Sequence, residues 1–191
     1  EFAIKGLEET SNYLFNNEAA SLNTGNQIEE ALNNLDQKIT DYLVKISANS
    51  LSEAESEGHN VLMHTVTDLE RIGDHFENIL EFAEYKHTNK LKFTDEAIEG
   101  MSGMFTLAIE ALKESIAAIE NTDKQRAHKV LELERKLDKM ERQLRKQHIV
   151  RLNNGTCIAQ AGLIYVDILS NLERVGDHAK NIAETIIGEQ D

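Results

Sequence analysis

The sequence contains no proline and no tryptophan, and Cys157 is its single cysteine. Because proline interrupts helices more strongly than any other residue, its absence leaves long helices free to form. One cysteine excludes a disulfide framework and a zinc site built on several thiolates, and it is typical of a reducing cytosol. The chain also lacks the run of about 20 apolar residues that a bilayer-spanning helix needs, and the layout of a signal peptide. We therefore expect a helical, cytoplasmic protein without direct insertion of this segment into a membrane.

Positive charge is scarce as well. The chain has 34 acidic residues against 20 Lys and Arg, which gives a formal net charge of −14. Such a charge repels nucleic-acid phosphates and anionic lipid head groups, and the sequence shows no basic stripe with interleaved aromatic residues to offset it. We therefore expect no nucleic-acid partner. The acidity suits simple solubility or the capture of cations.

The apolar residues follow the spacing of amphipathic helices, so the fold class is all-α. The clearest rows are Ile28, Leu32, Leu35, Ile39, Leu43 and Ile46, and then Val130, Leu133, Leu137, Met140 and Leu144. Turn-forming residues predict breaks at 23–26, 48–50, 86–94, 121–123 and 153–155, which leave six helices without a strand. Ser52 with Glu55 predicts a capping box, and Asp123 predicts an N-cap.

An internal repeat is the strongest signal in the chain. Residues 68–79 match residues 171–182 at eight of twelve positions, at a constant offset of 103 residues. Each copy lies in the middle of the third predicted helix of its half. We therefore expect two tandem three-helix bundles, residues 1–90 and 91–191, related by an internal pseudo-two-fold repeat.

Acidic residues share one face of the repeated helix. In the first copy they are Glu70, Asp74, Glu77 and Glu81, and in the second Glu173, Asp177 and Glu184. Carboxylates stacked one helical turn apart repel each other when both are ionised, and a bound cation reverses that effect. Oxygen ligands of this kind suit Mg²⁺, Ca²⁺, Mn²⁺ or ferric iron.

A preceding helix offers a matching pair in each half. Glu134 and Asp138 have the same Glu-x-x-x-Asp spacing as the repeat, but their counterparts in the first half are Glu29 and Asn33. We therefore expect the second bundle to bind a cation better than the first. The alternative is that all of these carboxylates form ordinary solvated helix faces.

Glycine and histidine also recur inside the repeated helix. Gly73 and Gly176 cost helix stability, so we expect each to allow a neighbouring helix to approach closely. His75 and His178 directly follow the repeated aspartates. We interpret them as helix-packing or surface residues before second-shell metal partners.

The phrase Leu-Glu-Arg-Ile/Val-Gly-Asp-His followed by Asn-Ile, present twice in the chain, resembles the PhoU family. The resemblance covers essentially the whole chain. It implies two three-helix bundles and a regulatory, non-enzymatic role in phosphate transport and phosphate signalling. It also implies metal ions on the acidic motifs, and the matching positions are Glu134, Asp138, Glu173, Asp177, Glu70, Asp74 and Glu29.

The implied partners are the membrane component of a phosphate transporter or a phosphate-sensing signalling protein. PhoU-like domains also occur as cytosolic C-terminal parts of sodium/phosphate cotransporters. The chain starts at Glu1 inside a helical pattern, and this favours the cotransporter context.

Two other functions compete with this interpretation. A ferritin-like di-iron oxidase requires two Glu-x-x-His motifs on facing helices, and only Glu84 and His87 have that spacing. A purely structural helical adaptor, in which the acidic faces contact a partner without metal, remains open. Metal analysis of the purified protein separates this adaptor from a metal-binding regulator.

Overall fold

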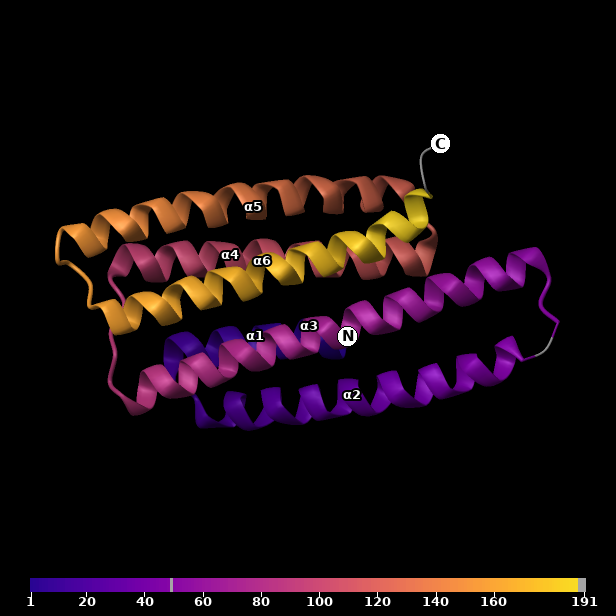
Figure 1. Cartoon of the computed structure of the whole chain (residues 1–191), viewed down its shortest axis with the longest axis horizontal. Helices are drawn as coiled ribbons and strands as arrows, with labels where there is room; N and C mark the ends of the chain where they lie inside the picture. The colour runs from indigo at the N-terminus through magenta and orange to yellow at the C-terminus, as the bar shows by residue number, and fades with distance from the viewer. Residues whose placement is uncertain (49, 189–191) are drawn as a thin grey trace.

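The computed structural model describes residues 1–48 and 50–188, and within these ranges it consists of six α-helices without a β-strand (Figure 1). The helices are α1 (Phe2–Asn16), α2 (Ala19–Ser47), α3 (Glu53–Thr88), α4 (Asp95–Asn121), α5 (Lys124–Asn153) and α6 (Ala159–Ile187). The predicted all-α class is confirmed. Both α3 and α6 run unbroken through the repeated glycines.

Two predicted helix starts are confirmed at the level of individual hydrogen bonds. The Ser52 hydroxyl accepts from the backbone N–H of Glu55, whose carboxylate accepts from the Ser52 N–H, so the capping box is complete. Asp123 accepts the backbone N–H groups of Gln125 and Arg126 at the start of α5. The break predicted at 48–50 includes residue 49, which lies outside the described residues.

The break predicted at residues 23–26 is wrong. Helix α1 instead ends at Asn16, and the φ of 57° at the next residue, Asn17, lies in the left-handed region that asparagine tolerates better than most residues. Gly25 lies inside α2, and a Cβ there would stand 2.6 Å from Leu80 Cδ1 of α3. Glycine therefore serves close packing at this position, and its turn preference is overridden by the tertiary contact.

The larger of two apolar clusters extends through both halves of the chain, and a smaller one lies within the second half. Each half packs three sequential helices side by side, and α3 and α6 lie together at the centre (Figure 1). The residues predicted to be buried in the repeat are fully buried: Ile72, Phe76, Ile79, Val175, Ala179 and Ile182. Because one buried cluster joins residues before and after position 90, the division there into two folding units stays a prediction.

The repeated glycines mark equivalent helix contacts. A Cβ on Gly73 would stand 3.2 Å from Leu32 Cδ1 of α2, and a Cβ on Gly176 would stand 2.5 Å from Leu137 Cδ2 of α5. Close helix approach is therefore confirmed at both positions, and it is tighter in the second half. No helix among residues 1–48 and 50–188 is both long and apolar enough to cross a bilayer.

Candidate metal centre

Three carboxylates converge in the second half of the chain. Glu134 and Asp138 come from α5, and Asp177 comes from α6; one oxygen of each lies within 4.8 Å of the others. The contact between Leu137 and Gly176 explains this convergence, because these residues directly precede Asp138 and Asp177. Because Gly176 has no Cβ, α5 and α6 can approach closely there, and their carboxylates come together. Three hard oxygen donors without a thiolate or imidazole fit Mg²⁺, Ca²⁺ or Mn²⁺ better than a soft metal.

The electrostatics of this cluster favour a cation. Burial raises the pKa of Asp177, and the nearby carboxylate of Asp138 raises it further. Burial also raises the pKa of Glu173, with Asp177 and Asp138 adding to the effect. Glu173 is not one of the three converging carboxylates, but it lies close enough to Asp138 and Asp177 to be affected by their charges. Each raised pKa means that the ionised carboxylate is disfavoured in the folded protein. A bound cation would stabilise the ionised form.

Two basic side chains already neutralise part of the second cluster. Lys180 Nζ lies 3.1 Å from Glu134 Oε1, and Arg142 Nη2 lies 3.3 Å from Asp138 Oδ2. Glu134 is 7% exposed, so its ion pair with Lys180 is partly shielded from water. A metal ion at this position must compete with Lys180 for the Glu134 carboxylate.

The first half gathers its acidic residues differently. Burial raises the pKa of both Glu29 and Glu70, and the Asp74 carboxylate raises each of them further. Asn33 donates its amide N–H to Glu29, while Arg71 forms ion pairs with Glu70 at 3.6 Å and Asp74 at 3.3 Å. Within the described part of the chain, three potential ligand atoms converge only in the second half.

Sequence reasoning missed a fourth carboxylate in the first cluster. Glu77 was assigned to the acidic face but not to the metal candidates. Burial raises its pKa, and the next largest influence is the carboxylate of Glu29 on the facing helix. Its repeat counterpart is Lys180. Each half therefore has four carboxylates in or beside its acidic cluster, and the second half has a lysine where the first has Glu77.

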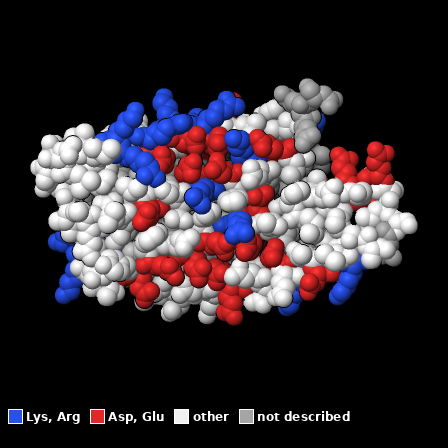
Figure 2. Space-filling view, in the orientation of Figure 1, with Lys and Arg blue, Asp and Glu red and all other residues white. Residues whose placement is uncertain are grey.

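The two clusters form separate acidic bands on one side of the molecule. Figure 2 shows one band between α5 and α6 and another between α2 and α3, each interrupted by basic side chains. The Glu-x-x-His pair lies elsewhere. His87 Nε2 is 2.9 Å from the main-chain oxygen of Tyr13, so the ring faces α1 and contributes to neither band.

The repeated histidines lie between the two halves. His75 Nδ1 of α3 is 3.0 Å from Asn171 Oδ1 of α6, and His178 Nδ1 of α6 is 2.8 Å from Asp68 Oδ1 of α3. The packing role predicted for these residues is confirmed, and their contacts cross from one copy of the motif to the other.

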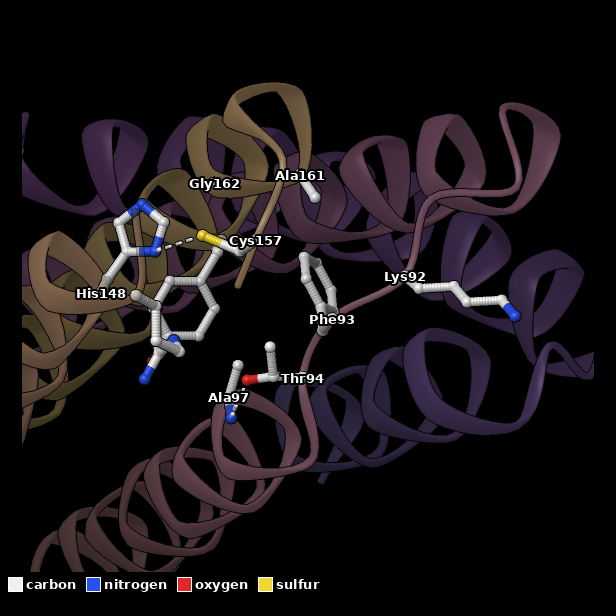
Figure 3. Close-up of a pocket in the computed structure, with 10 residues that line it drawn as sticks. Lys92, Phe93, Thr94, Ala97, His148, Cys157, Ala161 and Gly162 are labelled. Carbon is white, nitrogen blue, oxygen red and sulfur yellow. Dashed lines mark hydrogen bonds between the residues drawn. The ribbon is translucent and has the colours of Figure 1, made fainter. Parts of the chain in front are cut away.

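A small pocket at one end of the second bundle contains the cysteine (Figure 3). Cys157 is half-buried, and its Sγ is 3.9 Å from His148 Nδ1. The pocket has a volume of about 10 Å³, which leaves room for about one water molecule and not for a phosphate ion.

Comparisons with known proteins agree with this architecture. A family model described as the PhoU domain matches residues 1–83 and 101–186. The "Phosphate-specific transport system accessory protein PhoU homolog 1" of Thermotoga maritima is 33% identical over 120 residues, which is 63% of this chain and 51% of the relative. A PhoU homolog of Xylella fastidiosa is 24% identical over 159 residues, 83% of this chain and 66% of that protein. The chain thus spans between half and two thirds of the length of these curated relatives.

Solved structures show the same fold. The crystal structure of PhoU from Pseudomonas aeruginosa has a TM-score of 0.90 at 21% identity, covering 97% of this chain and 88% of that one. The phosphate transport system regulatory protein PhoU from Streptococcus pneumoniae has a TM-score of 0.85 at 19% identity, covering 97% and 86%. At these identities the likeness concerns the arrangement of the helices.

Proposed function

Because the chain belongs to the PhoU family, we propose that it is a cytoplasmic regulator of a phosphate transport system. The observation that carries the proposal is the family match across both copies of the doubled motif. The Thermotoga maritima relative, named as an accessory protein of phosphate-specific transport, supports it. In this role the protein catalyses no reaction and acts by binding partners.

The partner that fits this role is the membrane component of a phosphate transporter or a phosphate-sensing signalling protein. A covalent version of the same arrangement, in which the chain is the cytosolic domain of a sodium/phosphate cotransporter, would use the same surfaces. The intact gene distinguishes the two, because membrane spans would precede the region encoding Glu1 in a cotransporter.

We further propose that the second acidic cluster holds a hard cation. Glu134, Asp138 and Asp177 would supply the first ligands, and Glu173 would add negative charge beside them. The cation would relieve the mutual repulsion of these carboxylates and join α5 to α6. Glu29, Glu70, Asp74 and Glu77 would form a second, weaker position.

The regulatory role is tested in cells from which the gene has been deleted. We expect phosphate uptake to become insensitive to external phosphate, and the wild-type chain to restore that sensitivity. If uptake and its regulation are unchanged by the deletion, the proposed function is wrong.

The metal proposal is tested by titrating the purified protein with Mn²⁺ and analysing its metal content. Wild type should bind Mn²⁺, and a variant carrying both Asp138→Asn and Asp177→Asn should not. If neither protein binds metal and the variant restores regulation in cells as well as wild type does, the adaptor function without metal is correct.

A further inference from the structure

The basic residues of this acidic chain are concentrated on one helix. Helix α5 carries ten of the 20 Lys and Arg and only four acidic residues. The rest of the chain has ten basic and 30 acidic side chains. Helix α5 contains no Phe, Tyr or Trp, so it is not a basic stripe with interleaved aromatic residues, but its charge is opposite in sign to the net charge of −14 of the whole chain.

Four of these residues form a straight row on the outer side of α5. Arg135, Lys139, Arg142 and Lys146 are spaced by four, three and four residues, which places them within a narrow sector of the helix. All four are exposed, and Figure 2 shows basic side chains along the edge of the molecule over α5. We call this row the α5 basic stripe.

The stripe is largely unpaired. Arg142 forms an ion pair with Asp138, but Arg135, Lys139 and Lys146 form none with any described residue. Other α5 cations behave differently, since Arg126 and Lys129 both bind Glu114. Three neighbouring cations without an ion-pair partner among residues 1–48 and 50–188 favour an anionic partner outside the chain.

Exposed aliphatic side chains continue the same face. Ile149 and Val150 follow Lys146 by three and four residues, and each is 56% exposed. Just beyond the end of α5, Ile158 and Leu163 are 56% and 70% exposed. The face therefore changes from basic to apolar as it approaches one end of the bundle.

The cations and exposed aliphatic side chains of this α5 face indicate what kind of surface it binds. From Arg135 to Val150 the face spans about 22 Å along a convex helix, at about 1.5 Å per residue. Cations beside isolated aliphatic side chains match the plane of lipid head groups, where the charges meet anionic lipids and the aliphatic groups reach the acyl boundary. A protein groove would instead require a continuous apolar row along the helix.

We propose that the α5 basic stripe, with Ile149 and Val150, docks this chain on the surface of an anionic lipid bilayer. Asp138 lies beside the stripe in its ion pair with Arg142, and carboxylates farther than about 8 Å from the membrane are largely screened at physiological salt. The docking surface adjoins the candidate metal centre, because Arg142 of the stripe forms an ion pair with Asp138 of the carboxylate cluster. The inference goes beyond the proposed function and does not depend on it.

Vesicle co-sedimentation tests the proposal with the full chain. Wild type should bind vesicles of phosphatidylcholine mixed with phosphatidylglycerol, and binding should be lost on vesicles of phosphatidylcholine alone and at high salt. In the triple variant Arg135→Gln, Lys139→Gln and Lys146→Gln, the partition coefficient should fall about 100-fold, since each cation near an anionic leaflet contributes about fivefold.

A matched control removes the same charge elsewhere. Lys5, Lys38 and Lys45 are exposed residues of the first half, and changing all three to Gln should leave vesicle binding within about twofold of wild type. A further variant with Ile149→Asn and Val150→Asn keeps every cation and should still bind less. Circular dichroism and urea denaturation confirm that each variant is folded.

Three results would overturn the proposal. The first is that wild type does not bind the anionic vesicles. The second is that the control triple variant loses as much binding as the stripe variant. The third is binding to polyglutamate without binding to vesicles, which would assign the stripe to an acidic protein partner instead.

Discussion

His75 and His178 stack on each other at the junction of the two halves, with ring centroids 5.3 Å apart and an interplanar angle of 27°. Each ring also contacts the first residue of the opposite copy of the motif, Asn171 for His75 and Asp68 for His178. The repeated motif thus has two sides. Its acidic side forms the candidate metal clusters, and its histidines join the halves.

The contact between Asp68 and His178 should contribute measurably to stability. Asp68→Ala leaves the half-buried His178 without its carboxylate partner, and we expect a loss of about 1–3 kcal/mol in the free energy of unfolding. Asp167→Ala is the matched control, because Asp167 is an exposed aspartate of α6. Urea denaturation of both variants is the measurement. Equal effects in the two would mean that the contact adds nothing.

The repeated glycines should differ in their tolerance of alanine. Gly176→Ala puts a methyl group 2.5 Å from the tip of the fully buried Leu137, whereas Gly73→Ala meets Leu32 at 3.2 Å. Alanine gains up to about 1 kcal/mol of helix propensity at either site, but overpacking costs about 1–3 kcal/mol. We expect Gly176→Ala to destabilise the protein and Gly73→Ala to be nearly neutral. Denaturant unfolding would contradict this if Gly73→Ala were the more damaging change.

Cation affinity at the second cluster should depend on both its carboxylates and its lysine. Asp138→Asn removes a ligand and a charge, and should abolish most tight Mn²⁺ binding. Lys180→Gln frees Glu134 from its ion pair, and should strengthen binding by about tenfold. Asn33→Asp adds a carboxylate to the first cluster and should raise its affinity for Mn²⁺. Isothermal titration of the three variants measures these changes.

A matched substitution controls for net charge in these titrations. Lys38→Gln removes an exposed lysine outside both clusters and should leave Mn²⁺ affinity unchanged. If Asp138→Asn binds like wild type, the carboxylates of α5 and α6 are an ordinary solvated face. An effect of Lys38→Gln equal to that of Lys180→Gln would show that only the total charge matters.

The stability provided by His148 should decrease in acid. Its ring is buried against Tyr165, and burial, with the cation of Arg151, lowers its pKa below the ordinary 6.5. The unfolded chain then binds a proton more readily than the folded chain, so stability is lost as the pH falls from above 6.5 through the folded pKa. The difference in unfolding free energy between wild type and His148→Asn should shrink over that range. A difference that stays constant between pH 8 and pH 5 contradicts this.

Periodicity and repetition predicted six helices and most of their buried faces, but the apolar row of α2 is wrong at Leu35 and Ile39, which are 39% and 37% exposed. Ile72 and Val175 are buried in the core because the apolar face of an amphipathic helix packs against the neighbouring helices and away from water. The Asp123 cap and the packing of Gly73 and Gly176 also follow from local rules. These features depend on residues close together in the sequence or on a pattern repeated at a fixed offset.

Some features that depend on the facing helix were missed. The turn-like segment containing Gly25 is helical because Leu80 packs over it, and nothing near Gly25 in the sequence reveals that contact. The influence of Glu29 on Glu77 likewise appears only when α2 and α3 are placed side by side. The stripe on α5 was missed because the net charge of the chain was used in place of its distribution.

The bonds across the α3–α6 junction bear on how such a chain could arise. If two identical copies of the first half paired in this way, each His75 would meet an Asp68, and two copies of the second half would pair each His178 with an Asn171. The fused chain has one acidic and one neutral partner instead. A gene that began as a symmetric dimer would, after duplication, be free to change one side of this junction while keeping the other. Asp68 and Asn171 occupy equivalent positions of the two copies and differ by one charge, as such divergence would produce.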